Sequence, residues 1–206
     1  MRLIIAFSLL LAGGQSAASD APTVLVFGDS LSAGYGIDVD QSWATLLQAR
    51  LKQLGYEHRV INASIGGDTT ESGAARISQA IDTFAPALII LELGGNDGLR
   101  GIPPGTMRAN LYEIIKTSTD SGAAVVLLGI RIPPNYGQRY IAEFEDVFRQ
   151  LASELNVPWI EFFLQGVALN AELMQDDGIH PNAVAQPILL DNAWPIISSA
   201  LANQGG

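Results

Sequence analysis

The sequence predicts a three-layer α/β/α domain with a five-stranded parallel sheet, and three observations support this prediction. Apolar runs typical of strands alternate five times with helical patterns. The runs are continuous, as in strands buried on both faces, rather than alternating between apolar and polar residues. Several of them end in glycine and a small polar residue, which is typical of the edge where parallel sheets bind ligands. The chain has 206 residues, 48% of them hydrophobic, which is enough for the core of one domain.

Each predicted element follows from its local pattern. The strands are expected at residues 24–27, 59–63, 87–93, 124–130 and 157–163. The helices are expected at about residues 41–55, 70–84, 105–121, 140–155 and 186–202. Gly55 and Gly122 are suitable helix stops, and Pro195 predicts a kink or a break in the last helix. After the first strand, the chain is expected to continue as an open loop.

The first 18 residues are predicted to be a secretory signal peptide. A positive charge at Arg2, an apolar run over residues 3–11 and small residues up to Ser19 follow the order of such leaders. The apolar run is shorter than the ~20 residues that span a bilayer, so we expect no stable membrane anchor. We therefore expect a single domain over residues 19–206 in a periplasmic or secreted protein.

Composition excludes several classes of function. The formal net charge is −10, which disfavours binding to nucleic acids and to anionic lipid surfaces. The chain has no cysteine, so it has no disulfide, no thiolate nucleophile and no cysteine-based metal site. Only two histidines occur, and they are far apart in the sequence. We therefore expect no metal and no cofactor, and we expect a monomer.

A candidate nucleophile follows the first strand, in the sequence Gly28-Asp29-Ser30. A serine nucleophile needs a base, and the two histidines differ in position. His58 precedes the second strand, at the opposite edge of the sheet, and we expect it to be a surface residue. His180 follows the fifth strand, at the same edge as Ser30. The sequence therefore favours His180 as the base.

Two adjacent carboxylates, Asp176 and Asp177, compete for the role of orienting His180. We favour Asp177 because a separation of three residues through Gly178 brings both side chains to the same side of a turn. We expect Asp176 to bond the local backbone.

The next two strands end in residues suited to stabilising an oxyanion. Gly66-Gly67 follows the second strand and Asn96 follows the third. Two backbone N–H groups and an amide aimed at one point stabilise the charge of a tetrahedral intermediate. The neighbouring Asp29, Asp68 and Asp97 are expected to cap turns or helices.

Two common nucleotide-binding motifs and the nucleophile elbow of α/β-hydrolases are absent. The sequence has neither a Gly-x-x-x-x-Gly-Lys phosphate loop nor a Gly-x-Gly-x-x-Gly fingerprint. Ser30 also lies outside a Gly-x-Ser-x-Gly nucleophile elbow.

Taken together, these motifs resemble the four sequence blocks of the SGNH (GDSL) hydrolases. The blocks are Gly-Asp-Ser-Leu-Ser at 28–32, Gly67, Gly-Gly-Asn-Asp at 94–97 and Asp-Gly-Ile-His-Pro at 177–181. Residues 28–36, 135–140 and 174–182 resemble the bacterial multifunctional acyl-CoA thioesterase/lysophospholipase/arylesterase branch. The resemblance implies a flavodoxin-like fold, Ser30 as nucleophile with Asp177 and His180, and an oxyanion hole of Ser30, Gly67 and Asn96.

The resemblance also implies an activity and a substrate class. The expected reaction is hydrolysis of carboxylic esters and thioesters of small molecules or lipids (aryl esters, acyl-CoA, lysophospholipids) through an acyl-enzyme. A loop over residues 99–104 is expected to close on the acyl chain, with Ile102, Pro104 and Tyr136 as substrate-binding residues. Acyl-CoA is cytoplasmic, which conflicts with export. A carbohydrate acetyl esterase and a non-catalytic binding module are the alternatives.

Overall fold

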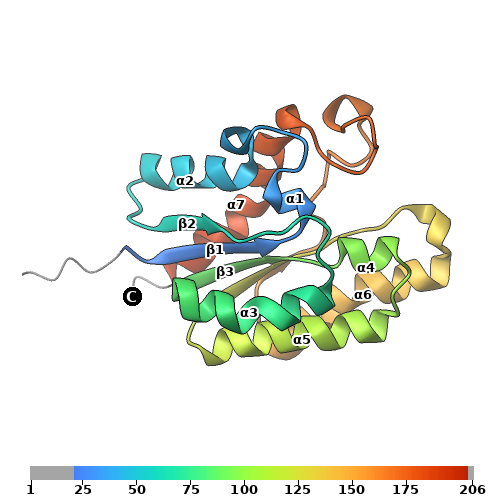
Figure 1. The fold of residues 1–206 in the computed structure, drawn as a ribbon, viewed down its shortest axis with the longest axis horizontal. Helices are drawn as coiled ribbons and strands as arrows, with labels where there is room; N and C mark the ends of the chain where they lie inside the picture. Colours follow the sequence, from blue (N-terminus) through green and yellow to red (C-terminus); the bar gives the residue numbers. More distant parts are fainter. Residues whose placement is uncertain (1–20, 204–206) are drawn as a thin grey trace, which may run out of the picture.

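The computed structural model describes residues 21–203, which form one parallel sheet between two layers of helices (Figure 1). The strand order is β2-β1-β3-β4-β5, and every neighbouring pair is parallel. This is the flavodoxin-like order, so the predicted fold class is confirmed. The strands are β1 (Thr23–Gly28), β2 (Arg59–Asn62), β3 (Pro86–Glu92), β4 (Ala124–Leu128) and β5 (Trp159–Ile160).

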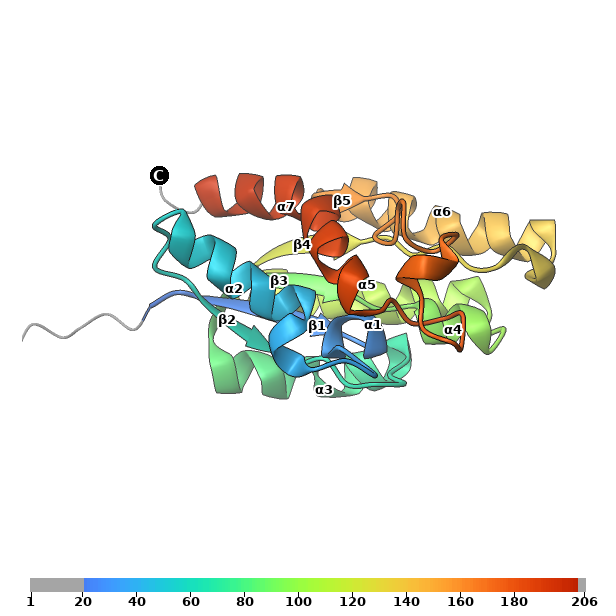
Figure 2. The same ribbon diagram turned by 90° about the horizontal axis from the view of Figure 1, so that it is seen from above.

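The helices cover both faces of the sheet, with α2 and α7 on one face and α3, α5 and α6 on the other (Figures 1 and 2). The long helices are α2 (Trp43–Gln53), α3 (Thr70–Phe84), α5 (Pro104–Asp120), α6 (Gln138–Leu155) and α7 (Gln186–Ala202). The short ones are α1 (Ser30–Ala33), α4 (Gly95–Leu99), η1 (Val39–Gln41), η2 (Pro134–Tyr136), η3 (Ala171–Leu173) and η4 (Ala183–Ala185). Within residues 21–203, no helix has the length and hydrophobicity needed to cross a membrane.

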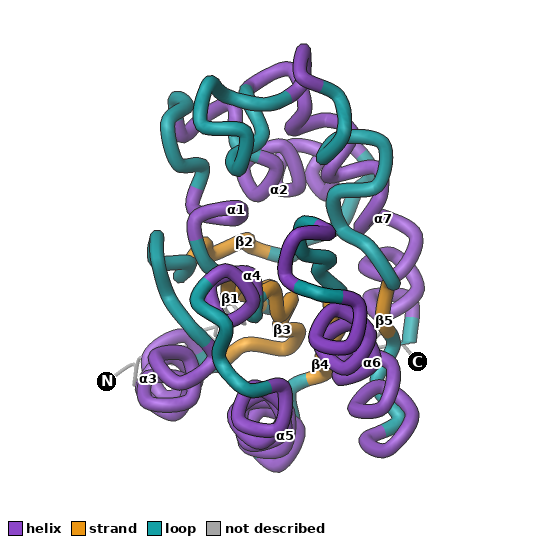
Figure 3. The backbone as a smooth tube through the Cα atoms, turned by 90° about the vertical axis from the view of Figure 1, so that its right-hand side faces the viewer, coloured by secondary structure: helices purple, strands orange, loops and turns teal. Residues whose placement is uncertain are grey.

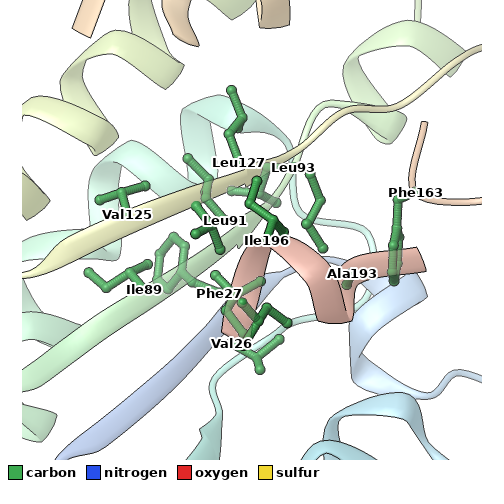
Figure 4. Close-up of a cluster of buried hydrophobic side chains, with 14 of the residues drawn as sticks. Val26, Phe27, Ile89, Leu91, Leu93, Val125, Leu127, Phe163, Ala193 and Ile196 are labelled. Carbon is green, nitrogen blue, oxygen red and sulfur yellow. The ribbon is translucent and has the colours of Figure 1, made fainter. Parts of the chain in front are cut away.

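The central strands are buried on both faces, as their continuous apolar sequences predict. Every residue of β1 is buried, and so is all of β3 except Ala87. Figure 4 shows part of this core, in which Ala193 and Ile196 of α7 lie among side chains of β1, β3 and β4. The rigid centre of the sheet therefore supports whatever follows the ends of β1 and β3.

Three predicted features differ in the structure. The fifth strand pairs over only Trp159 and Ile160. The preceding Pro158 has no N–H to donate, which limits the strand at its amino end. The last helix is not broken at Pro195, one of the two outcomes that the sequence predicts there, but continues through it as one element. Ser30 begins the short helix α1 instead of an open loop, because the Asp29 side chain caps that turn.

The order of the strands determines where a ligand can bind. The chain moves from β1 to one side to form β2, and then to the other side of β1 to form β3. This reversal leaves a crevice beyond the carboxyl ends of β1 and β3. The helices α1 and α4 follow these two strands and lie together at that edge (Figure 3).

Two glycine-to-alanine substitutions compare a tightly packed position after β4 with an open position on α5. A Cβ on Gly129, just after β4, would lie 2.5 Å from the backbone oxygens of Ile160 and Glu161. Gly129→Ala should therefore lower the free energy of unfolding by about 2 kcal/mol, as measured by urea denaturation. Gly105→Ala is the control, because a Cβ there meets no atom within 4 Å. It should be neutral or stabilise by up to about 1 kcal/mol; equal effects of the two changes would contradict the packing.

Candidate active site

Ser30 lies at the start of α1, directly beyond the end of β1. The capping residue Asp29 accepts a hydrogen bond from the Leu31 N–H at 3.0 Å through Oδ1. As the first residue of a helix, Ser30 has a backbone N–H without a partner within the helix. Its side chain is half-buried, so the hydroxyl is fixed by the turn and remains accessible.

The structure brings together Ser30, His180 and Asp177 in one chain of hydrogen bonds. His180 Nε2 lies 2.9 Å from Ser30 Oγ, across 150 residues of sequence. The other ring nitrogen, Nδ1, lies 2.6 Å from Asp177 Oδ2. In this arrangement a hydroxyl, an imidazole and a carboxylate are in contact in the order that base-assisted nucleophilic attack requires.

A tight turn in the loop before α7 holds His180 beside its carboxylate. Asp177 Oδ1 accepts hydrogen bonds from the backbone N–H groups of Ile179 and His180, at 2.9 and 3.0 Å. Gly178 has a φ of +65°, a left-handed conformation that glycine adopts without strain. The turn closes with a 2.8 Å hydrogen bond from the Gln175 N–H to the His180 carbonyl. The predicted fold-back through Gly178 is therefore present.

These hydrogen bonds also set the charge of Asp177. The backbone N–H of His180, the His180 ring and the Ile179 N–H all favour the carboxylate and lower the pKa of Asp177 to about 2. Asp177 is therefore ionised at any pH at which the protein would be expected to work. Asp176 is exposed, and within the described part of the chain its side chain makes no hydrogen bond or ion pair. The expectation that Asp176 bonds the local backbone is wrong.

Gly66, Gly67 and Asn96 lie close to the turn that carries Ser30. A Cβ on Gly66 would lie 3.9 Å from the Ser30 Cβ, so this turn passes directly beside the serine. Gly67 has a φ of +84° and is exposed. Asn96, in α4, donates from Nδ2 to Asp29 Oδ2 at 3.0 Å and to the Asp68 carbonyl at 2.9 Å. One of these amide hydrogens must be shared or released before Asn96 can bind an oxyanion.

The three aspartates next to these residues have structural roles: Asp29 and Asp97 bind the starts of helices, as the sequence predicts, whereas Asp68 forms an ion pair instead of a cap. Asp29 caps α1, and Asp68 forms a 2.7 Å ion pair with Arg76. Asp97 accepts from the N–H and the hydroxyl of Thr70, at 2.8 and 2.6 Å, at the start of α3. Burial raises the pKa of Asp29 to about 6, although hydrogen bonds from Leu31 and Asn96 act in the opposite direction. The pKa of Asp97 is also raised by burial.

Ile102, Pro104 and Tyr136, the residues expected to bind the acyl chain, belong to the loop over residues 99–104 and to η2. The Tyr136 hydroxyl donates to the Leu99 carbonyl at 3.0 Å, and the Tyr140 hydroxyl donates to the Ile102 carbonyl at 2.7 Å. The loop over residues 99–104 is thus attached to η2 and α6, and Pro104 begins α5. A shallow hollow of about 470 Å³ lies nearby. It is lined by Tyr136, Gly137, Gln138, Arg139, Tyr140 and Glu143, and by none of the catalytic candidates.

The second histidine is remote from this edge along the sheet. His58 immediately precedes β2 and therefore lies at the amino end of the strands. It is half-buried rather than fully on the surface, and its Nδ1 has no hydrogen-bond partner among the described residues. Residues 21–203 contain no group of three or more His, Cys, Asp or Glu side chains that could hold a metal ion.

Comparison with known proteins identifies the family of this chain. Residues 26–186 match the GDSL-like Lipase/Acylhydrolase family. The chain belongs to this family. The match spans the serine turn, the Asn96 block and the His180 turn, so every part of the site just described lies within it.

The similarity to known relatives and solved structures extends over most of this GDSL-like hydrolase. It is 48% identical to the esterase TesA of Pseudomonas aeruginosa over 181 residues, which is 88% of this chain and 90% of the relative. It is 42% identical to thioesterase 1/protease 1/lysophospholipase L1 of Escherichia coli K12 over 84% of this chain and 82% of the relative. A crystal structure of TesA superposes with a TM-score of 0.85 at 48% identity, covering 86% of this chain and 99% of that one. The family and fold expected from the sequence are therefore confirmed, and the hydrolase is an enzyme of the SGNH type.

Several contacts in the site are not predicted by the motifs. The Tyr35 ring lies against the His180 ring with centroids 4.4 Å apart, and Gln175 Nε2 donates to the Tyr35 carbonyl at 2.7 Å. Arg100 donates to the Gly67 carbonyl at 2.9 Å. The only sequence signal for the first contact is Tyr35 between Gly34 and Gly36, since an aromatic residue in a glycine-rich turn is a candidate for packing on a neighbouring ring.

The two neighbouring aspartates provide a matched test of the hydrogen-bond chain. Asp177→Ala removes the carboxylate that orients the imidazole and should lower kcat by on the order of 10⁴-fold. Asp176→Ala, one residue away and exposed, should change kcat by less than about twofold. Steady-state hydrolysis of p-nitrophenyl acetate measures both. A larger loss in Asp176→Ala than in Asp177→Ala would show that the wrong carboxylate has been assigned.

Proposed function

We propose that this protein is a serine hydrolase that cleaves carboxylic esters and thioesters through an acyl-enzyme on Ser30. The single observation that supports this most is the hydrogen-bond chain from Ser30 Oγ through His180 to Asp177. The chain lies at the edge of a parallel sheet where such folds bind their substrates. In the proposed roles, Ser30 is the nucleophile, His180 the general base and acid, and Asp177 the group that orients the imidazole.

The first half of the proposed reaction forms the acyl-enzyme. His180 Nε2 accepts the Ser30 proton as Oγ attacks the acyl carbonyl carbon, and the carbonyl oxygen becomes an oxyanion. The N–H groups of Ser30 and Gly67 and the Asn96 amide stabilise this charge. When the tetrahedral intermediate collapses, the C–O or C–S bond breaks and the leaving alcohol or thiol takes the proton from His180.

The second half of the reaction regenerates the enzyme. A water molecule gives a proton to His180 and attacks the acyl-enzyme carbonyl, which forms a second oxyanion in the same place. Its collapse releases the carboxylic acid and returns the proton to Ser30 Oγ. No step requires a metal or a cofactor, since the chain's own side chains account for every proton.

The substrate class proposed here includes aryl esters, acyl-CoA and lysophospholipids. Relatives at 42–48% identity carry the names esterase, arylesterase and thioesterase/lysophospholipase, which supports acyl esters and thioesters over acetylated carbohydrates. Ile102, Pro104 and Tyr136 remain the proposed residues for the acyl chain. We also propose that the protein is a monomer and is periplasmic or secreted, with residues 1–18, which lie outside the described part, as its signal peptide.

The nucleophile is tested directly by covalent labelling. A fluorophosphonate probe should label the wild-type protein at a single site, and Ser30→Ala should abolish both labelling and hydrolysis. Initial rates with p-nitrophenyl acetate, p-nitrophenyl octanoate, an acyl-CoA and a lysophosphatidylcholine then define the substrate range. Persistent labelling of Ser30→Ala would mean that another serine reacts, and activity confined to acetylated sugars would replace the proposed substrate class.

The oxyanion hole has a separate test. Asn96→Ala removes one donor to the developing charge and should lower kcat by on the order of 10²–10³-fold. A folded variant is verified by its unchanged circular dichroism spectrum. A near-wild-type kcat would exclude Asn96 from transition-state stabilisation.

A further inference from the structure

Glu92, the last residue of β3, is a fully buried carboxyl group beneath the Ser30 turn. Its side chain is 0% exposed, in a strand that is otherwise apolar. Oε2 accepts a 2.7 Å hydrogen bond from the hydroxyl of Ser32, which is also 0% exposed. Oε1 has no hydrogen-bond partner among the described residues. The proposed mechanism leaves this group without a role.

The carboxyl group touches the serine turn on both sides of the nucleophile. Glu92 is paired with Gly28 at the end of the β1–β3 ladder. A Cβ on Gly28 would lie only 2.7 Å from Glu92 Oε2 and 3.0 Å from Ser32 Oγ, so the carboxyl lies directly against the Gly28 backbone. Gly28 precedes Ser30 by two residues and Ser32 follows it by two. The position of Ser30 is thus defined by a turn packed around one carboxyl group.

The surrounding charges favour the protonated form of this group. Burial, and secondarily the nearby Asp29 carboxyl, raise the pKa of Glu92 well above its usual value. Hydrogen bonds from the Ser32 hydroxyl and from the backbone N–H groups of Asp29 and Ser32 act in the opposite direction but are outweighed. Arg76, from α3, is the cation on this side, but it binds Asp68 and the carbonyls of Ala63 and Gly28. His180 acts electrostatically on Asp29. Among residues 21–203, Glu92 therefore has no cation as an ion-pair partner.

We propose that Glu92 is a positioning residue for the nucleophile, which holds the Gly28–Ser32 turn as a neutral, protonated carboxylic acid. The proposal rests on Ser30 being the nucleophile. A neutral acid can accept from Ser32 while it contacts the Gly28 backbone, whereas a carboxylate there would add a second buried negative charge next to Asp29. Glu92 touches no substrate, and its effect on the reaction passes through the geometry of α1.

The protonated form has a measurable signature in stability. An unfolded glutamate ionises near pH 4.5, but folded Glu92 keeps its proton to a higher pH. Between these two pKa values, each pH unit disfavours folding of the wild type up to tenfold. Glu92→Gln is neutral at every pH and escapes this effect. The folding equilibrium constant of Glu92→Gln relative to wild type should therefore rise with pH from 5 to 8, measured by denaturant unfolding.

A matched control separates this pH dependence of stability from a general effect of removing a negative charge. Glu113 is an exposed glutamate on α5, and Glu113→Gln should show a folding constant relative to wild type that does not change from pH 5 to 8. A flat ratio for Glu92→Gln as well would overturn the proposal, because it would mean that Glu92 is ionised in the folded protein.

The positioning role is tested by the reactivity of Ser30. Glu92→Leu leaves the buried Ser32 hydroxyl without its acceptor and should slow fluorophosphonate labelling at pH 7 at least tenfold. It should lower kcat for p-nitrophenyl acetate and leave KM unchanged, because the change lies below the turn. Glu92→Gln keeps an acceptor for Ser32 and should label within about threefold of wild type, and Glu113→Gln should match wild type. Equal rates for Glu92→Leu and wild type would overturn the proposal, as would equal slowing of the Leu and Gln variants.

A second variant and the unfolding data cover the cases in which Glu92→Leu is unfolded or the wild type does not react. If Glu92→Leu does not fold, Ser32→Ala removes the same hydrogen bond by deleting its donor. Ser32→Ala should slow fluorophosphonate labelling of Ser30 three- to tenfold. A wild-type labelling rate in Ser32→Ala would overturn the proposal. If wild-type protein is not labelled at all, the proposed function fails. The pH dependence of Glu92→Gln unfolding still decides whether Glu92 is a neutral acid.

Discussion

The pairing of β1 with β3 is the constraint on which the rest of the site depends. Their ladder ends with Gly28 opposite Glu92, so the two chain segments leave the sheet side by side. One segment turns into α1 and carries Ser30, and the other turns into α4 and carries Asn96. Both strands are buried in the middle of the sheet and cannot shift without disturbing the core. The relative position of the Ser30 hydroxyl and the Asn96 amide is thus set by two buried central strands.

Asp29 connects these two segments. One carboxylate oxygen caps α1 and the other holds the Asn96 amide, so a single buried side chain fixes the orientation of both functional groups. Arg76 adds a third connection, since its guanidinium binds Asp68 and the Gly28 carbonyl and lies 3.8 Å from the centre of the Phe27 ring. The site is consequently built from mutually bonded polar groups, which become fixed only when all partners are present.

Much of this arrangement follows from local sequence, and the remainder does not. The alternation of apolar runs and helical patterns predicts the α/β/α fold, and the scarcity of histidine directs attention to His180. The four-residue helix α1 is too short to show helical periodicity, so the sequence indicates a loop there. The hydrogen bond between Asp29 and Asn96 joins residues 67 positions apart, and no local pattern encodes it. Glu92 is likewise hidden in an apolar run, because burial of a charged residue is decided by tertiary packing.

The acidic character of the protein has a consequence for the product. The ester substrate is uncharged at the reacting group, whereas the released acid is an anion at neutral pH. At the proposed site, that anion would form near the ionised carboxylate of Asp177, in a chain with a formal net charge of −10. Charges within a Debye length of about 8 Å repel it with little screening by salt. In the proposed reaction, this repulsion favours release of the carboxylate product.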